Sequence, residues 1–257
     1  MSARPSRRLR LRFRPSLSPK RSTRHVRSLR CPSVPPFAQD CLETAADIWG
    51  ASFEHPFVQA LADGSLSEEQ FAFYQMQDAR YLEAFSDATA ILSTRCTRPG
   101  DKLWFVDAAK LALEVEGELH AGYGERFGYT PEDVAALELT PNNRAYQTHM
   151  IATAERRTLV EGTAAVAPCP WLYIALGQHL LDTRGAPSDD HPYAEWLRMY
   201  SDPEFNEYME NLLERLQRFA DASGDAARGR AKDAFVTSAR YEWMFWQQAW
   251  EQQEWPV

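Results

Sequence analysis

Apolar residues recur at intervals of three and four along most of this chain, from about residue 38 to residue 252. This spacing is typical of helices that bury one face, and no alternating apolar and polar run is long enough to indicate a strand. Stop and start signals, such as Asp63 with Gly64 and the capping-box pair Ser67 and Gln70, divide the pattern into segments. We predict an all-α protein with about eight helices and a short helical piece that begins at residue 130. The eight helices cover residues 38–61, from 67 onward, 101–127, 143–161, 170–181, 192–200, 203–221 and 225–252.

The short connections between these segments favour a single helical domain, over residues 38–257, rather than two domains. Residues 1–37 differ in composition, with 11 of the 28 Lys and Arg residues and none of the 36 Asp and Glu residues. An Arg-rich, Ser-rich and acid-free segment is typical of a transit peptide, although an over-extended start or a basic tail for nucleic acid has the same composition. Its low apolar content predicts disorder.

The remainder of the chain is strongly acidic, with 17 basic against 36 acidic residues. Such a body repels a phosphate backbone, so we expect no nucleic acid partner. No apolar run approaches the roughly 20 residues of a membrane span, so we expect no membrane partner. The four cysteines are too few and too irregularly spaced for a disulfide framework. We therefore expect a cytoplasmic protein, or an organellar one if residues 1–37 form a genuine transit peptide.

Asp78 lies inside an apolar stripe of the second predicted helix. The stripe steps by three and four residues, which places all its members on one helix face: Phe71, Tyr74, Asp78, Tyr81 and Phe85. Burying a carboxylate without a partner costs several kcal/mol, so Asp78 needs a partner, a ligand or water. A structural partner, such as a core hydroxyl or an arginine, would satisfy this requirement as well as a ligand would.

Glu242 occupies the same kind of position in the last predicted helix. It lies in a stripe with Phe235, Ser238, Phe245 and Ala249. Desolvation among aromatic residues raises the pKa of a carboxyl group, which turns it into a proton donor near neutral pH. A structural salt bridge would explain the position of Glu242 equally well.

Cys169 lies between two prolines at the predicted start of the helix over 170–181, where the helix dipole favours the reactive thiolate. Tyr173 follows one turn later on the same face. An inert buried thiol is the commoner role for a single cysteine. Tyr146 and Tyr200 lie in further apolar stripes, and by pattern alone they are ordinary core aromatics.

Four segments resemble the TenA (thiaminase II) family, in the same order and at similar spacing over residues 38–252. The family's N-terminal signature resembles EHPFVQALADGSLSEEQFAFYQMQDARYLEAF, and its nucleophile segment resembles PCPWLYIALGQHLL. Two further family segments resemble HPYAEWLRMY and the terminal FVTSARYEWMFWQQAW. The resemblance implies a heme-oxygenase-like helical bundle, a homotetramer, and no metal or organic cofactor.

The reaction that the resemblance implies acts on a small molecule in thiamin salvage. It hydrolyses 4-amino-5-aminomethyl-2-methylpyrimidine to the hydroxymethylpyrimidine and ammonia, and it cleaves thiamin more slowly. By the same resemblance Cys169 is the nucleophile, Glu242 transfers protons and Tyr81 helps to activate the thiol. The resemblance also implies that Asp78 binds the amidine-like edge of the pyrimidine. Three tyrosines would line the site and stack on the pyrimidine ring: Tyr146, Tyr173 and Tyr200. Relatives often carry Glu where this chain has Ala175, which bears on substrate preference.

Other classes of protein share the expected fold. An oxidase of the PQQ-synthesis type or a di-iron oxidase needs His and carboxylate ligands on facing helices, and the sequence shows no such spacing. A non-enzymatic regulatory protein is the third possibility, and the acidic body argues against direct DNA binding. No phosphate-binding loop, G-x-S-x-G, CxxC or H-E-x-x-H motif is present.

Overall fold

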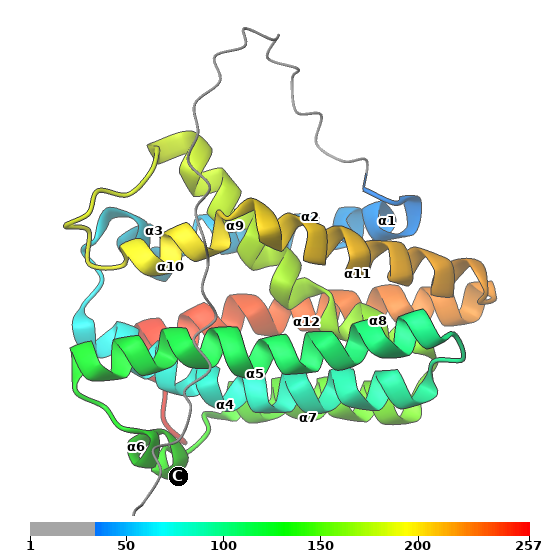
Figure 1. Cartoon of the computed structure of the whole chain (residues 1–257), viewed down its shortest axis with the longest axis horizontal. Helices are drawn as coiled ribbons and strands as arrows, with labels where there is room; N and C mark the ends of the chain where they lie inside the picture. Colours follow the sequence, from blue (N-terminus) through cyan, green and yellow to red (C-terminus); the bar gives the residue numbers. More distant parts are fainter. Residues whose placement is uncertain (1–33) are drawn as a thin grey trace, which may run out of the picture. The chain divides into compact units, whose positions relative to one another are not determined.

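The computed structural model describes residues 34–257, apart from the side chains of residues 115–121 and 203–204. Every regular element in this part of the chain is an α-helix, which confirms the predicted all-α class (Figure 1). The 12 helices are α1 (Pro36–Thr44), α2 (Ala46–Phe53), α3 (Pro56–Asp63), α4 (Glu68–Arg95), α5 (Pro99–Phe127), α6 (Pro131–Ala136), α7 (Pro141–Arg156), α8 (Leu159–Val166), α9 (Pro168–Arg184), α10 (Ala194–Tyr200), α11 (Pro203–Asp221) and α12 (Asp225–Glu251).

The start of the compact unit lies at Val34, and the predicted disorder of residues 1–33 falls outside the described residues. Helix α1 therefore begins inside the segment that we assigned to the tail. Phe37 is 6% exposed and packs in a hydrophobic cluster that also contains Trp171 and Phe235. Its burial ties the first helix to α9 and α12.

Two expected helices are interrupted, which accounts for the larger number of elements. The segment 38–61 forms three helices, with breaks at Ala45 and at His55, and the prediction of one helix there was wrong. Pro56 lacks a backbone N–H and begins α3, while the His55 ring accepts a hydrogen bond from the amide of Phe57. The segment 143–161 also divides, because Thr158 begins α8 with a capping box.

Capping at two of the expected helix ends agrees with the sequence. Ser67 and Gln70 form the predicted capping box at the start of α4. Gly64, at the end of α3, adopts the left-handed conformation with φ of 80°, which favours glycine. These local signals set the ends of the helix that carries Asp78.

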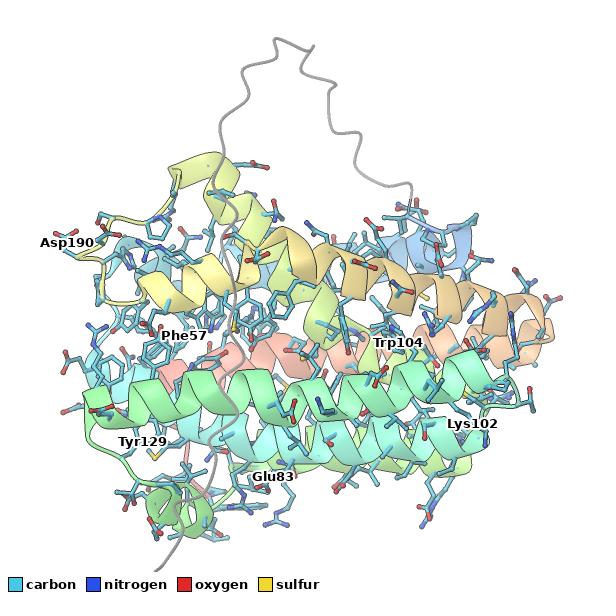
Figure 2. All side chains as sticks on the ribbon, viewed as in Figure 1. Phe57, Glu83, Lys102, Trp104, Tyr129 and Asp190 are labelled. Atoms are coloured by element: carbon cyan, nitrogen blue, oxygen red, sulfur yellow. The ribbon has the colours of Figure 1, made fainter. Side chains whose placement is uncertain are left out.

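The long helices form the frame of the fold. Helices α4, α5, α7 and α12 run alongside one another, and α9 crosses them at a steep angle (Figure 1). Helix α4 packs along both α5 and α7, and α12 packs against α7 and α8. Phe57 is fully buried inside this frame, whereas Glu83, Lys102 and Asp190 lie on its outside (Figure 2).

Helix α9 begins at Pro168 rather than at the predicted Pro170. The backbone of Ala167 stays helical, so α8 leads almost directly into α9. The resulting stretch, Leu159–Arg184, is long and apolar enough to cross a membrane by length and composition, but 78% of its most apolar window is buried inside the fold. Core packing accounts for its apolar character.

Candidate active site

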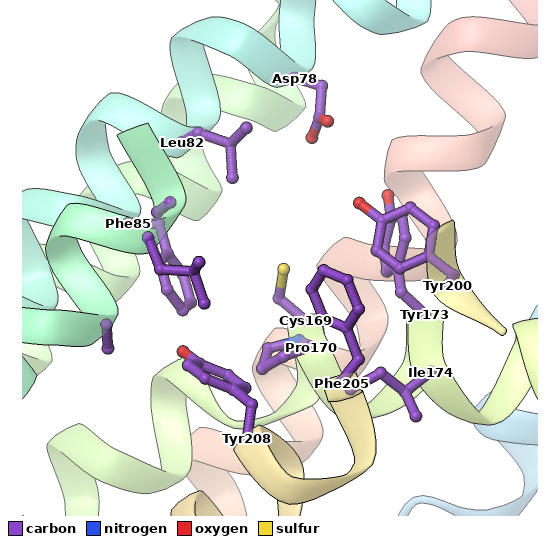
Figure 3. Close-up of a pocket in the computed structure, with 13 residues that line it drawn as sticks. Asp78, Leu82, Phe85, Cys169, Pro170, Tyr173, Ile174, Tyr200, Phe205 and Tyr208 are labelled. Atoms are coloured by element: carbon purple, nitrogen blue, oxygen red, sulfur yellow. The ribbon is translucent and has the colours of Figure 1, made fainter. Parts of the chain in front are cut away.

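Four of the predicted site residues line one pocket between α4, α5, α9, α10 and α11. They are Asp78 from α4, Cys169 and Tyr173 from α9, and Tyr200 from α10. In Figure 3 the sulfur of Cys169 points into the space between Asp78 and the rings of Tyr173 and Tyr200. The remaining lining is mainly apolar. The pocket therefore presents a thiol and a carboxylate inside a wall of aromatic and aliphatic side chains.

Cys169 differs from the other two cysteines that the structure describes. Cys41 and Cys96 are buried, and burial raises the pKa of the Cys41 thiol to about 12 and also raises that of Cys96. Cys169 is only partly buried, and it is not in a disulfide. Of these three thiols, Cys169 is the one that lines the pocket. Its exposure and position suit a nucleophile.

Cys169 lies in the first turn of α9, which begins at Pro168. The turn before Cys169 is helical, and the amide of Ala167 donates to the carbonyl of Thr163. Helix α9 thus follows α8 almost directly, and the effect of the helix dipole on the Cys169 thiol stays a prediction. Nearby, the Ser238 hydroxyl donates a 2.6 Å hydrogen bond to the carbonyl of Ala165, which ties this junction to α12.

Glu242 lies in the core next to the pocket rather than in its lining. It is 2% exposed, and its Oε1 accepts a 2.5 Å hydrogen bond from the Tyr146 hydroxyl. Burial raises the pKa of Glu242 to about 8, the Tyr146 bond lowers it, and the charge of Asp78 raises it further. Glu242 is therefore mostly protonated at neutral pH, which is the condition that a proton donor requires.

Tyr81 and Tyr146 lie within electrostatic reach of both the Cys169 thiol and the buried Glu242. Their ring centroids are 4.9 Å apart, and burial raises the pKa of both phenols well above the ordinary value. The charges of Cys169 and Glu242 raise both pKa values further, so each phenol lies within electrostatic reach of both groups. The Tyr81 hydroxyl donates to the sulfur of Met150 at 3.3 Å.

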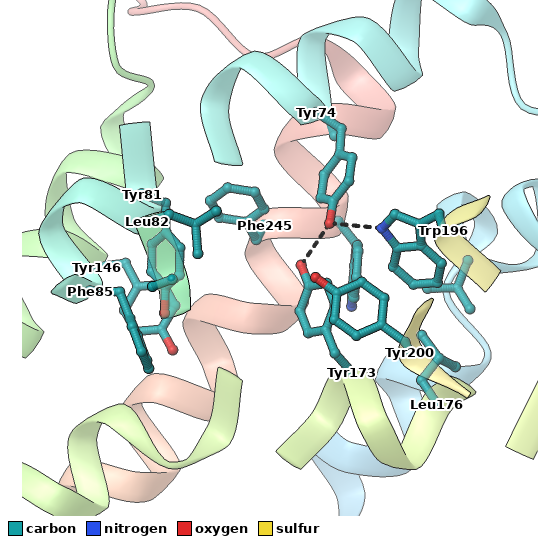
Figure 4. Close-up of a cluster of buried hydrophobic side chains, with 14 of the residues drawn as sticks. Tyr74, Tyr81, Leu82, Phe85, Tyr146, Tyr173, Leu176, Trp196, Tyr200 and Phe245 are labelled. Carbon is teal, nitrogen blue, oxygen red and sulfur yellow. Dashed lines mark hydrogen bonds between the residues drawn. The ribbon is translucent and has the colours of Figure 1, made fainter. Parts of the chain in front are cut away.

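Tyr173 and Tyr200 line the pocket and belong to an aromatic cluster that Figure 4 shows apart from Tyr81 and Tyr146. Their ring centroids are 4.9 Å apart, and Tyr200 lies 4.7 Å from the ring of Trp196. The ring of Tyr173 lies 4.9 Å from that of Trp246. This packing holds both tyrosine rings in place at the pocket wall.

Sequence reasoning missed the contribution of α11. Phe205 and Tyr208 of this helix line the pocket, and Figure 3 shows Tyr208 across the space from Asp78. The ring of Tyr208 also packs 5.2 Å from that of Trp104 on α5. The three-residue spacing of Phe205 and Tyr208 was the available signal. Ala175, which we connected with substrate preference, is not part of the pocket lining.

The residues that the structure describes contain no group of three or more His, Cys, Asp and Glu side chains placed to hold a metal ion.

A model of the TENA/THI-4/PQQC family matches residues 42–252, and the chain belongs to this family. The chain is 33% identical over 220 residues to an aminopyrimidine aminohydrolase from Halalkalibacterium halodurans. The matched region covers 85% of this chain and 97% of that protein. An aminopyrimidine aminohydrolase from Bacillus subtilis is 30% identical over 220 residues, and the match covers 85% of this chain and 92% of that protein. The predicted family is therefore confirmed.

Solved structures share the fold. A TenA homologue from P. horikoshii OT3 superposes with a TM-score of 0.74 at 32% identity and covers 84% of this chain and 99% of that one. A protein from Shewanella denitrificans, described as having a heme oxygenase-like fold, superposes with a TM-score of 0.67 at 13% identity, covering 83% and 92%. The predicted heme-oxygenase-like fold is confirmed.

Proposed function

We propose that this protein is an aminopyrimidine aminohydrolase (thiaminase II). It converts 4-amino-5-aminomethyl-2-methylpyrimidine and water to the hydroxymethylpyrimidine and ammonia in thiamin salvage. The observation that carries this proposal is the Cys169 thiol, which points into a pocket that it shares with Asp78 and a set of aromatic rings (Figure 3). The aminopyrimidine aminohydrolases that the chain resembles support the same reaction.

The pocket suits a planar ring with an amino group on its edge. Tyr173, Tyr200 and Tyr208 provide aromatic surface for stacking. The carboxylate of Asp78 accepts hydrogen bonds from the amino group at the amidine-like edge of the pyrimidine. This contact sets the ring orientation, so that its reactive carbon faces the sulfur of Cys169.

Covalent addition divides a difficult displacement into two easier ones. The Cys169 thiolate adds to the ring carbon beside the one that bears the aminomethyl group. The electron pair moves through the ring and breaks the C–N bond, while Glu242 gives its proton to the leaving nitrogen and ammonia departs. The product of this step is an adduct with an exocyclic carbon–carbon double bond.

Water completes the reaction. Glu242, now a carboxylate, removes a proton from water, and the hydroxide adds to the exocyclic carbon. The electron pair returns to the ring and expels the Cys169 thiolate, which restores the enzyme. In this scheme Tyr146 holds Glu242 through its hydrogen bond, and Tyr81 lies within electrostatic reach of the sulfur.

We also infer a homotetramer located in the cytoplasm that binds neither nucleic acid nor membrane and uses no cofactor. The family resemblance supports the tetramer. Exposed apolar side chains on α5 support association of some kind, since Leu103, Val106 and Leu113 are 64%, 49% and 52% exposed. Light scattering coupled to size-exclusion chromatography measures the oligomeric state. A monomer at micromolar concentration would contradict the proposed tetramer.

The proposed reaction is tested directly by an activity assay of the purified protein with the aminomethylpyrimidine as substrate. Equimolar ammonia and hydroxymethylpyrimidine, detected by an enzyme-coupled assay and by chromatography, are the expected products. Metal analysis of the same sample tests the oxidase alternative. Stoichiometric iron together with oxygen consumption, and no release of ammonia, would contradict the hydrolase.

A further inference from the structure

A surface groove along α7 and α12 reaches the residue that precedes the buried acid in the sequence. Most of its lining comes from α7, and α12 contributes Tyr241, the sequence neighbour of Glu242. Three exposed arginines of α7 and its C-terminal end also line the groove, and their charge does not change with pH. The groove is therefore open to water, in contrast to the core in which Glu242 lies.

The ring of Tyr241 covers that of Tyr146. The two rings are stacked, with centroids 5.3 Å apart and an angle of 22° between their planes. Tyr241 is partly buried and lines the groove, whereas Tyr146 is fully buried and does not. Tyr146 thus contacts Tyr241 through its ring and Glu242 through its hydroxyl, at 2.5 Å.

Exclusion of water decides the protonation state of Glu242. Burial is the largest cause of its raised pKa, which reaches about 8, and burial outweighs the opposing effect of the Tyr146 hydrogen bond. Water that entered from the groove in place of the Tyr241 ring would solvate the carboxylate and bring the pKa back toward its ordinary value. Glu242 would then lose its proton at a lower pH.

We propose that the Tyr241 ring seals the Glu242–Tyr146 pair against water from the groove, so that Tyr241 is a positioning residue for the proton donor. The inference rests on the proposed function for the role of Glu242 in the reaction, whereas the seal itself is a property of the fold. Tyr241 acts through Tyr146 and Glu242, since it does not line the substrate pocket.

The ionisable groups around Glu242 come from several helices. Asp78 of α4 raises the pKa of Glu242, and the Tyr146 hydrogen bond lowers it. Burial lowers the pKa of His149 in the groove lining, so His149 stays neutral above pH 7. Three phenols have a pKa that burial raises well above the ordinary value, so they keep their protons in the same range: Tyr81, Tyr146 and Tyr173.

Two further groups on elements packed against α12 do not change their charge in this range. Glu161 of α8 pairs with Arg230 at 2.9 Å, and His55, just before α3, bonds to Gln247 and has a pKa lowered by burial. A reactive thiol does titrate in the range of Glu242, and Cys169 lies within electrostatic reach of the same phenols. A measurement on the carboxyl itself therefore tests the seal more directly than a rate does.

The first experiment follows the carboxyl of Glu242 by infrared difference spectroscopy on the full-length protein from pH 5 to pH 9. A protonated carboxyl has its own C=O stretching band, and the part of this band that Glu242→Gln removes belongs to Glu242. We expect the band to disappear at a lower pH in Tyr241→Ala than in wild type, because water reaches the carboxylate. Tyr241→Phe keeps the ring and should titrate as wild type does.

Phe219→Ala is the matched control for the loss of a ring. Phe219 is partly buried, and its ring stacks on that of the fully buried Phe105, with centroids 6.5 Å apart and an angle of 12°. It lines neither the pocket nor the groove. Both alanine variants should lower the urea midpoint of unfolding, but only Tyr241→Ala should move the infrared band. If Tyr241→Ala does not fold, Tyr241→Leu should give a smaller shift in the same direction.

Activity adds a readout with a defined sign. In Tyr241→Ala the alkaline limb of the kcat profile for ammonia release should move to lower pH, with little change in KM, since the pocket lining is intact. Tyr146→Phe should move the limb the other way, because it removes the hydrogen bond that lowers the pKa of Glu242. A merely structural role of Tyr241 would lower stability and leave the position of the limb unchanged.

The outcomes separate the two proposals. A wild-type protein that releases no ammonia from the aminomethylpyrimidine would contradict the proposed function, and the infrared titration would still test the seal. If the Glu242 band of the Tyr241 variant disappears at the same pH as in wild type or at a higher pH, the seal is wrong while the proposed function stands. The seal is also wrong if Glu242→Gln removes no part of the band at pH 6.

Discussion

The hydroxyl of Tyr146 donates a 2.5 Å hydrogen bond to Oε1 of Glu242, and both side chains are almost completely buried. A hydrogen bond from a phenol favours the carboxylate, whereas burial favours the neutral acid. Burial has the larger effect and raises the pKa of Glu242 to about 8. The pair thus forms an acid that keeps its proton at neutral pH and is held in one orientation.

Removal of this hydrogen bond should move the pH dependence of activity to higher pH. The reaction needs protonated Glu242, so wild-type kcat should fall as the pH rises above about 8. Tyr146→Phe removes the contact that lowers the pKa of Glu242, and the alkaline limb should shift to higher pH. The kcat profile from pH 6 to pH 10 measures this shift, and a downward shift would contradict it.

The same carboxyl predicts the pH dependence of stability. The pKa of Glu242 is raised in the fold from an unfolded value near 4.5 to about 8, so the unfolded state releases its proton at lower pH. Stability from this group is fully present below the unfolded value and is lost as the pH rises toward about 8. Glu242→Gln lacks this loss, and its stability relative to wild type should increase between pH 5 and pH 8.5.

Urea unfolding of wild type and Glu242→Gln at the two pH values measures the difference. The variant should be inactive in ammonia release at both values, which separates the role of the acid in the reaction from its effect on the fold. A parallel pH dependence of stability in the two proteins would show that Glu242 is ionised in the wild-type fold.

Gly177 allows α9 to approach the end of α10. A Cβ atom at Gly177 would lie 2.3 Å from the carbonyl oxygen of Tyr200, too close for either backbone to remain in place. We expect Gly177→Ala to lower stability by about 1–3 kcal/mol and to raise KM, because it displaces the Tyr200 ring from the pocket. Gly229→Ala on α12 is the matched control, since nothing lies within 4 Å of a Cβ there. It should be neutral or stabilising by about 0.5–1 kcal/mol in thermal unfolding.

Two ion pairs to the buried Asp101 join α11 to α5, and both helices contribute to the pocket lining. Arg215 and Arg218 of α11 both contact Asp101 of α5, and Asp101 is 4% exposed. Asp101→Asn leaves the arginines without their charge partner and should destabilise the fold by about 3–5 kcal/mol in urea unfolding. Asp189→Asn removes the exposed partner of Arg198 and should have no measurable effect. Equal effects of the two substitutions would contradict this account.

The stripes at helical spacing explain why much of the site could be predicted from the sequence. Asp78 and Glu242 stand in such stripes, and periodicity within one helix is a local property that needs no knowledge of neighbouring helices. Both residues are buried as predicted. Local signals also place the start of α4 and the end of α3.

Other parts of the site depend on contacts between distant segments. Tyr74 and Tyr173 are 99 residues apart, and Tyr74 and Trp196 are 122 apart, so no local pattern indicates their hydrogen bonds. Tyr208 faces the pocket because α11 packs across α5 and α9, and its amphipathic pattern does not say which helices it covers. The near-continuous passage from α8 into α9 was missed because two prolines around Cys169 are also typical of a helix start.

The central claim is that the thiol of Cys169 attacks the substrate in this pocket. Its most direct test is the rate of ammonia release from the aminomethylpyrimidine by wild type, Cys169→Ala and Cys41→Ala, the last of which alters a fully buried thiol outside the pocket. The account predicts that Cys169→Ala lowers kcat by about a thousandfold or more, while Cys41→Ala keeps wild-type activity. A Cys169→Ala protein that releases ammonia at the wild-type rate would contradict it.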